Sequence, residues 1–183
     1  MVSTWTEYWK DLNKSPTEKL IYKFKRRWGY KALLDCVDVG TPGTSLEIAA
    51  GKAGISHELK KRGWHTTGLD LLPFETELDN YVIGNIFNLP FEDKSFDLVL
   101  CSGLFEHFTK EQVKMIISEM RRVGKHIACW WPVKSFIWNF FIQIRKIISG
   151  DIPLNIYSHD LPLETYSGVF SFFWIFNVRW FYL

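Results

Sequence analysis

Three polar side chains stand at or near the ends of short apolar runs, and their types suit the recognition of a nucleoside. Glu47 precedes a turn of small residues at 49–54, with the sequence Ala-Ala-Gly-Lys-Ala-Gly. Small side chains let a backbone approach a ligand closely, and a helix that starts after such a turn offers free N–H groups. Asp70 can accept hydrogen bonds from both hydroxyls of a ribose. Asn85 can meet a purine edge through its acceptor and its donor.

Each of these residues also has an explanation that needs no ligand. The 49–54 turn can be a tight connection between a strand and a helix, Asp70 can cap a helix, and Asn85 can serve the backbone of a turn. The turn lacks the G-x-G-x-x-G spacing of dinucleotide-binding folds, which argues against a nicotinamide cofactor. The single segments leave the choice between ligand binding and turn geometry open.

The elements that must position these side chains alternate between strands and helices. Apolar runs predict five strands, and two helical patterns lie among them. The strands are expected at 45–50, 66–71, 81–86, 96–101 and 125–131, and the helices at 54–62 and 109–123. Thr109 and Gln112 fit a capping box, and Gly124 supplies the helix end.

Strands that are apolar nearly throughout and alternate with helices imply a mostly parallel sheet with helices on both faces. The predicted fold class is therefore a doubly wound α/β domain. In such sheets ligands bind outside the carboxyl ends of the strands, where Glu47, Asp70 and Asn85 are expected.

Length and composition bound the class of protein. A chain of 183 residues has the size of one domain, and its 47% hydrophobic and 23% charged residues are typical of a folded globular protein. The net charge of +2 is too small to propose a nucleic-acid partner. The apolar stretches are all shorter than the ~20 residues of a membrane span or are interrupted.

The three cysteines, Cys36, Cys101 and Cys129, are odd in number and lie far apart. Neither a disulfide framework nor a zinc site is predicted from them, and we expect no metal. The first twenty residues do not resemble a secretory signal, so a reduced, cytoplasmic protein is expected.

The flanks of the predicted sheet are helical and aromatic. Residues 5–37 are expected to form two helices, and 134–149 a basic, aromatic helix. The 134–149 helix can cap an acceptor pocket, pack in the core or lie at a membrane surface, and we favour the cap. A last helix is expected from Leu163, followed by a strand at 176–182.

Taken together, residues 46–132 resemble the class I S-adenosylmethionine-dependent methyltransferases, especially those acting on small molecules. The resemblance rests on 46–54, on 68–71, and above all on 84–99 (Gly-Asn-Ile-Phe-Asn-Leu-Pro-Phe-Glu-Asp-Lys-Ser-Phe-Asp-Leu-Val). The last stretch is similar to the family's passage from the adenine-contact loop into the fourth strand. The likeness continues through 102–108.

The resemblance implies a Rossmann-like methyltransferase fold over a single domain, 1–183, with a helical segment at 1–37, a cofactor-binding core at 45–132 and a cap-like and C-terminal segment at 133–183. It implies S-adenosylmethionine as the cofactor. The cofactor-binding residues that it implies are Glu47, Ala49, Gly51, Asp70, Leu71, Asn85, Ile86 and Ser102. The family usually ends with one more antiparallel strand than the sequence predicts, so the last strand is expected to be missing or the chain to be shortened.

The resemblance also implies a role for each residue. Glu47 would orient the turn or the amino group of the cofactor, while Ala49 and Gly51 would pass beneath its methionine. Asp70 would bind the ribose.

The adenine would lie between Leu71 and Ile86, with Asn85 at its exocyclic amine. Ser102 and Gly103 would lie beside the sulfonium. For Glu106 and His107 we favour structural roles near a helix start over acid–base roles, and no catalytic residue is predicted, because methyl transfer needs an aligned nucleophile above all.

Three positions depart from the family's pattern. Ala49 and Ala53 stand where glycine is usual, and Asn85 replaces an aspartate. Ala49 is interpreted as a mild change, whereas Ala53 is expected to require φ < 0 or a shift of the turn towards Gly54. Two functions remain open: methylation of a small, apolar or aromatic acceptor, and a weak or inactive binding module with the same fold.

Overall fold

The computed structural model of the chain describes residues 23, 29–35, 40–132, 168–172 and 176–182. The predicted 134–149 helix, the start of the helix expected from Leu163, Cys36 and most of the 5–37 segment lie outside these residues. Within 29–35 the structure contains the short helix α3 (Tyr30–Asp35).

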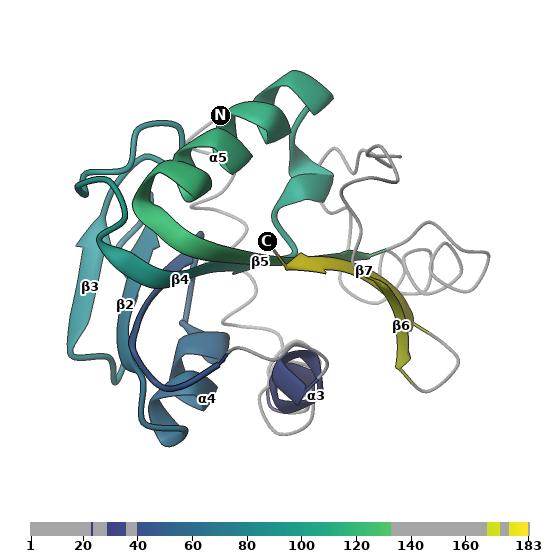
Figure 1. Cartoon of the computed structure of the whole chain (residues 1–183), viewed down its shortest axis with the longest axis horizontal. Coiled ribbons are helices and arrows are strands. Elements are labelled where there is room, and N and C mark those ends of the chain that lie inside the picture. The colour runs from purple at the N-terminus through teal and green to yellow at the C-terminus, as the bar shows by residue number, and fades with distance from the viewer. Residues whose placement is uncertain (1–22, 24–28, 36–39, 133–167, 173–175, 183) are drawn as a thin grey trace.

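One seven-stranded sheet runs through the molecule in the order β3-β2-β1-β4-β5-β7-β6 (Figure 1). The pairs β3–β2, β2–β1, β1–β4 and β4–β5 are parallel, and β5–β7 and β7–β6 are antiparallel. The bounds are β1 Thr44–Ile48, β2 His65–Asp70, β3 Asn80–Ile83, β4 Phe96–Ser102, β5 Gly124–Pro132, β6 Gly168–Phe172 and β7 Phe176–Tyr182. The predicted doubly wound fold is confirmed. The strand order reverses beside β1, so the carboxyl ends of β1 and β4 border the ligand crevice expected for such a sheet.

The expectation of a missing last strand is wrong. Residues Gly168–Phe172 form β6, and the predicted strand at 176–182 lies between β6 and β5 as β7. A five-residue apolar run cannot be assigned to helix or strand by periodicity alone, so the sequence does not predict β6.

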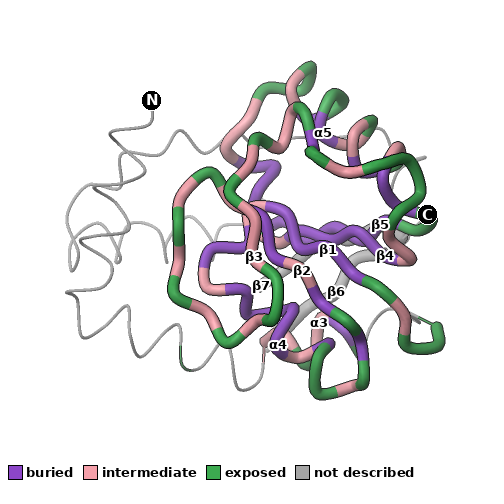
Figure 2. Tube along the Cα trace, turned by 90° about the vertical axis from the view of Figure 1, so that its left-hand side faces the viewer, coloured by how far each residue is buried: buried purple, intermediate pink, exposed green. Residues whose placement is uncertain are grey.

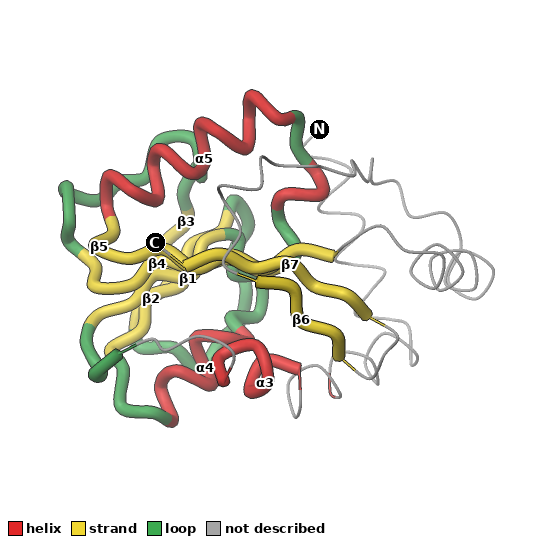
Figure 3. Tube along the Cα trace, turned by 45° about the vertical axis from the view of Figure 1, so that its right-hand side comes forward, coloured by secondary structure: helices red, strands yellow, loops and turns green. Residues whose placement is uncertain are grey.

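Helices cover both faces of the sheet (Figures 1 and 3). The helices α3 and α4 (Gly54–Lys61) lie on one face, and α5 (Lys110–Val123) lies on the other. Alternate residues of β4 serve the two cores: Val99 and Cys101 pack on the α5 side, while Leu98 and Leu100 pack on the α3–α4 side. The central strands are therefore buried on both faces (Figure 2), as the unbroken apolar runs predict.

The start of α5 confirms the predicted capping box. The Thr109 hydroxyl accepts from the Gln112 N–H at 3.3 Å, and the Gln112 side chain accepts from the Thr109 N–H at 3.0 Å. The helix ends at Gly124 as expected, but Gly124 is extended (φ −105°) and leads straight into β5. A Cβ at Gly124 would lie 2.7 Å from Cγ2 of Val99, so close packing against β4 is what requires glycine there.

Candidate functional site

The turn after β1 holds three residues in the left-handed region. Ala49 has φ 51°, Gly51 φ 51° and Ala53 φ 53°. The expectation that Ala53 would adopt a negative φ, or shift the turn towards Gly54, is wrong, and Ala49 is not a mild change. A left-handed conformation costs an alanine about 1–2 kcal/mol, so the surrounding structure must hold both residues in place.

Bonds at both ends of the turn fix this conformation. The Ala53 N–H donates to the Ala50 carbonyl at 2.7 Å, and the Ala50 N–H donates to the Leu69 carbonyl of β2 at 3.0 Å. Gly54 then begins α4 beneath the Tyr30 ring, where a Cβ would lie 2.1 Å from Cε2 of Tyr30. Packing against Tyr30 thus requires glycine at position 54, and Gly54 does not take over the left-handed conformation from Ala53.

Glu47 lies in β1 and is 5% exposed. Its Oε2 accepts from the Ser56 N–H at 2.7 Å, so the carboxylate holds the first turn of α4 from the neighbouring strand. Burial raises the pKa of Glu47 to about 7, although its hydrogen bonds to Ser56 act in the opposite direction. Of the two roles implied for Glu47, this geometry supplies the contact with the turn and helix.

Asp70 ends β2 and faces the turn after β1. Its Oδ2 accepts from the Gly51 N–H at 2.9 Å, and its Oδ1 accepts from the Leu72 N–H at 3.2 Å. Burial raises the pKa of Asp70, against the effect of these hydrogen bonds. Each carboxylate oxygen has a second lone pair, so both can still accept from the hydroxyls of a ribose.

The sequence interpretation missed Tyr81, on β3. Its hydroxyl lies 3.1 Å from the Gly51 carbonyl and 3.4 Å from the Leu72 carbonyl. Burial, and then the charges of Asp70 and Glu47, raise the pKa of Tyr81. The sequence offers only a weak signal for Tyr81: Gly68 is a glycine inside a predicted strand, and the structure shows that it leaves room for the Tyr81 ring on the next strand.

The segments after β2 and β3 are joined directly, because the Gly84 N–H donates to the Asp70 carbonyl at 2.9 Å. This bond brings together Leu71, which is 48% exposed, and the turn that contains Asn85 and Ile86. The predicted strand at 81–86 ends at Ile83, because this turn leaves the sheet.

Asn85 itself is exposed, and its Oδ1 accepts from the Phe87 N–H at 3.0 Å. The backbone role considered for Asn85 is therefore present in the structure, and a base amine would have to use the second lone pair of the same oxygen. Ile86 is partly buried against the α5-side core.

The end of β4 contributes Ser102 and Gly103. Ser102 pairs with Trp130 of β5, and the Gly103 N–H donates to the Trp130 carbonyl at 2.9 Å. Gly103 has φ 67°, which favours glycine. The short 3₁₀ helix Phe105–His107 follows and contains Glu106, which is 8% exposed. The acid–base candidates thus lie in a structured turn before α5.

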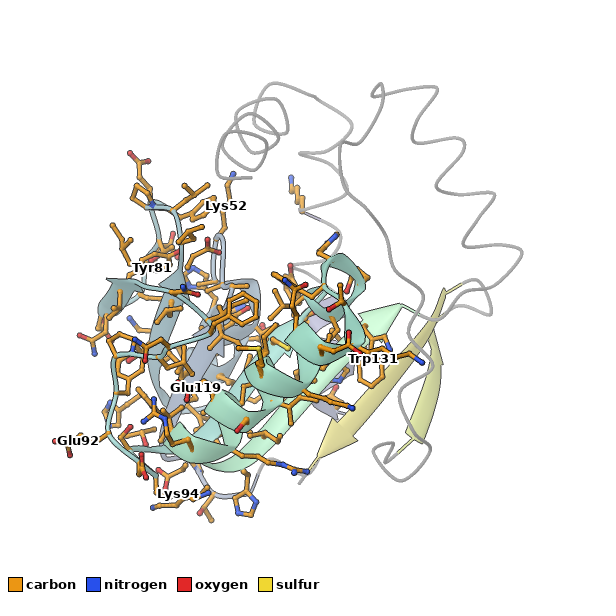
Figure 4. The ribbon with its side chains drawn as sticks, turned by 90° about the horizontal axis from the view of Figure 1, so that it is seen from above. Lys52, Tyr81, Glu92, Lys94, Glu119 and Trp131 are labelled. Carbon is orange, nitrogen blue, oxygen red and sulfur yellow. The ribbon has the colours of Figure 1, made fainter. Side chains whose placement is uncertain are left out.

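These contacts bring the segments after β1 and β2 together and join the turn after β3 to them. The end of β4 lies on the other side of β1, because β4 is paired with β1 in the sheet. Figure 4 shows Lys52 of the turn and Tyr81 towards one end of the strands, and Glu92 and Lys94 towards the other. In the part of the chain that the structure describes, no cluster of three or more His, Cys, Asp or Glu side chains could hold a metal ion. Within that part, too, no helix is both long and apolar enough to cross a membrane.

Comparison with known proteins identifies the same region. Residues 46–127 match the family model described as a methyltransferase domain. A demethylmenaquinone methyltransferase of Thermotoga maritima is 28% identical over 104 residues, which are 52% of this chain and 44% of that protein. The match therefore spans less than half the length of this curated relative.

Solved structures agree on the fold. The magnesium protoporphyrin IX methyltransferase of Synechocystis PCC 6803, crystallised with bound SAH, superposes with a TM-score of 0.63 at 15% identity, over 98% of this chain and 94% of that chain. A protein of Pyrococcus horikoshii OT3 gives a TM-score of 0.62 at 20% identity, over 82% and 86%. The family match over 46–127 and the sheet order together make the core of the chain similar to the S-adenosylmethionine-dependent methyltransferases, whose Rossmann-like fold it has.

Proposed function

We propose that this chain binds S-adenosylmethionine and transfers its methyl group to a small acceptor. The observation that carries the proposal is the position of Asp70. Its carboxylate stands at the carboxyl end of β2, is fixed by the N–H groups of Gly51 and Leu72, and keeps a lone pair on each oxygen. In doubly wound sheets an acidic residue at this position binds the hydroxyls of a ribose.

The other residues of the site have roles that follow from their positions. The 49–53 segment would pass beneath the methionine portion, with Glu47 holding α4 behind it. Leu71 and Ile86 would flank the adenine, and Ser102 would lie near the reacting end. When bound, the cofactor supplies an electrophilic methyl group on a sulfonium.

No general base is assigned, because aligning a nucleophile with the methyl group can provide most of the rate. The acceptor that we propose is small and apolar or aromatic. We retain the single domain over 1–183 and the cytoplasmic location as predictions.

A binding module without turnover is the second candidate. It is favoured by the two left-handed alanines and by the use of the Asn85 oxygen within its own turn, since both features limit how the site can adapt to a ligand. The two candidates share the cofactor site and differ in whether a methyl group leaves it.

Titration calorimetry of the full chain with S-adenosylmethionine and S-adenosylhomocysteine tests the proposal. Both are expected to bind, and absence of binding at millimolar concentration would remove the enzyme and the nucleoside-binding module together. Incubation with methyl-labelled cofactor and a panel of small aromatic and apolar acceptors then separates the two candidates. Binding without transfer to any member of the panel would favour the module.

A further inference from the structure

Gly51 and Leu72 are each held twice by the same two side chains. Asp70 accepts from the N–H of both residues, at 2.9 and 3.2 Å. The Tyr81 hydroxyl lies within hydrogen-bond distance of the carbonyl oxygens of the same two residues, at 3.1 and 3.4 Å. A phenol has one hydrogen to donate, so the two carbonyls share it or alternate. We call these four groups the Asp70–Tyr81 clamp.

The clamp acts where the backbone is strained. Gly51 lies midway between Ala49 and Ala53, and all three residues have positive φ. Strained conformations persist only where surrounding contacts over-determine them. The bonds of Gly51 to Asp70 and Tyr81 attach the middle of the turn to β2 and β3, strands that are distant in sequence.

The Tyr81 ring is itself fixed by the sheet. Tyr81 and Gly68 are paired across β2 and β3, and a Cβ at Gly68 would lie 2.9 Å from Cδ2 of the ring. The glycine thus leaves room for the ring beside β2, and the hydroxyl reaches the segments after β1 and β2. Because burial raises its pKa, the phenol keeps the proton that it donates.

We propose that Tyr81 is a positioning residue for the cofactor, which holds the turn after β1 and the segment after β2 in their ligand-ready geometry before anything binds. This inference rests on the proposed function, because the segments that the clamp joins are those assigned to the methionine portion and to the ribose and adenine. Tyr81 acts through Gly51, Leu72 and Asp70, and no contact between Tyr81 and the cofactor is required.

A turn without the clamp is expected to sample other conformations, because the Gly51 carbonyl loses its partner and an alanine leaves the left-handed region readily. The ligand would then bind only the fraction of molecules in which the turn is formed, and its apparent affinity would fall by that fraction.

The test compares Tyr81→Phe, which keeps the ring over Gly68 and removes only the hydroxyl, with Ser95→Ala. Ser95 donates a hydroxyl hydrogen bond of 2.8 Å to the Glu92 carbonyl before β4, at the other end of the strands. Tyr81→Phe is expected to weaken S-adenosylhomocysteine binding about 3- to 10-fold by calorimetry, the range for one neutral hydrogen bond, and Ser95→Ala to leave it unchanged.

Hydrogen exchange of the free protein gives a measurement that does not depend on the cofactor. In Tyr81→Phe the peptides covering 49–53 and 70–73 should exchange faster, whereas those of α5 should keep their wild-type rates. If the wild type binds neither cofactor form, the proposed function fails, yet these exchange rates still decide whether the clamp exists.

A second substitution distinguishes positioning from general stability. Glycine adopts the φ of Ala49 without strain, so Ala49→Gly should recover part of the affinity lost in Tyr81→Phe, and should improve it more in that background than in the wild type. If Tyr81→Phe only lowered general stability, Ala49→Gly would have the same effect in both backgrounds, so a larger gain in Tyr81→Phe identifies positioning. Unchanged exchange at 49–53 and 70–73 in Tyr81→Phe, unchanged affinity, or absence of rescue would each overturn the inference.

Discussion

The two ends of the parallel strands use carboxylates in opposite ways. At the amino ends, Asp97 accepts from the Thr44 N–H at 2.8 Å and from Lys125 at 2.7 Å, and these bonds lower its pKa to about 2. At the carboxyl ends, Glu47 and Asp70 accept from backbone N–H groups, and burial raises the pKa of both. Among the described residues no lysine or arginine forms an ion pair with Glu47 or Asp70.

Arg122 makes the contrast sharper. Its guanidinium sits between α5 and the 89–93 loop and has five hydrogen bonds, one for each N–H that it carries. They reach the Leu89 and Phe91 carbonyls and the carboxylates of Glu119 and Asp93. Every N–H of the Arg122 guanidinium is thus used inside the protein, whereas Glu47 and Asp70 keep lone pairs beside a strained turn. The comparison indicates that one end serves stability and the other retains capacity for a ligand.

The largest expected effect is on cofactor binding. Asp70→Ala should weaken S-adenosylhomocysteine binding by about 1.5–3 kcal/mol, the range for losing a charge-assisted hydrogen bond. The matched control is Asp79→Ala. Asp79 lies on the connection between β2 and β3, and its exposed carboxylate forms an ion pair with Lys60 of α4. Calorimetry of both variants, with folding checked by circular dichroism, tests this. Equal affinities in the two folded variants would contradict the ribose assignment.

The second prediction concerns pH. A folded pKa of about 7 lies above the ordinary 4.5 of Glu47, so burial of its neutral form stabilises the protein below pH 4.5, and this contribution is lost as the pH rises through 7. Asp70 acts in the same direction. Asp97 has a depressed pKa, so its contribution is present above pH 4 and is lost as the pH falls towards 2.

We therefore expect maximal stability near pH 4, where both contributions are present, and a loss on the order of 3 kcal/mol between pH 5 and pH 8. In Glu47→Gln, which can still accept from the Ser56 N–H, most of this loss should disappear. Urea unfolding at the two pH values measures it. A wild type that is equally stable at both would show that Glu47 is not buried as described.

The third prediction is a loss of stability without a loss of cofactor affinity. Arg122→Met removes the donor to the Leu89 and Phe91 carbonyls and leaves Glu119 with only the Leu89 N–H, so the melting temperature should fall by roughly 5 °C. S-adenosylhomocysteine affinity should stay within about twofold of the wild-type value, because the network lies at the other end of the strands. Loss of affinity in a folded Arg122→Met protein would mean that the two ends are coupled.

The same contrast explains what the sequence could predict. The five parallel strands and α5 could be predicted from apolar runs and a local capping signal. A strand buried on both faces and a Thr–Gln capping box are each recognisable from a few consecutive residues. Bonds between distant segments have no such local signal. The φ of Ala53 depends on a turn tied to β2, and the Tyr81 clamp depends on the pairing of Gly68 with the next strand.

The sequence therefore predicts which residues lie at the site, but it does not predict the hydrogen bonds between them. Glu47, Asp70 and Asn85 were placed at the carboxyl ends of strands, where the structure has them. That the Asn85 oxygen also serves the Phe87 N–H, and that Asp70 holds two loops, depends on turn geometry that several sequences could adopt.

The smallest expected effects come from relieving strain at the two ends. Ala49→Gly removes a left-handed alanine that costs about 1–2 kcal/mol and adds a glycine entropy cost of about 0.5–1 kcal/mol, so the free energy of unfolding should rise by about 0.5 kcal/mol. Ala53 is fully buried, and losing its methyl group costs a further ~0.8 kcal/mol, so Ala53→Gly should be close to neutral. Both variants should bind S-adenosylhomocysteine as well as or better than the wild type.

Lys94, with φ 55°, is the matched position at the amino end. Its side chain donates to the Arg121 carbonyl at 2.6 Å and to the Gly124 carbonyl at 2.8 Å, closing the end of α5. Lys94→Gly relieves the same strain but loses both bonds, so it should lower the free energy of unfolding although its backbone is relaxed. Urea unfolding of the three glycine variants measures the difference. If Ala49→Gly and Lys94→Gly changed stability in the same direction, the left-handed residues at the two ends would be equivalent, and strain would not distinguish the ligand end from the structural one.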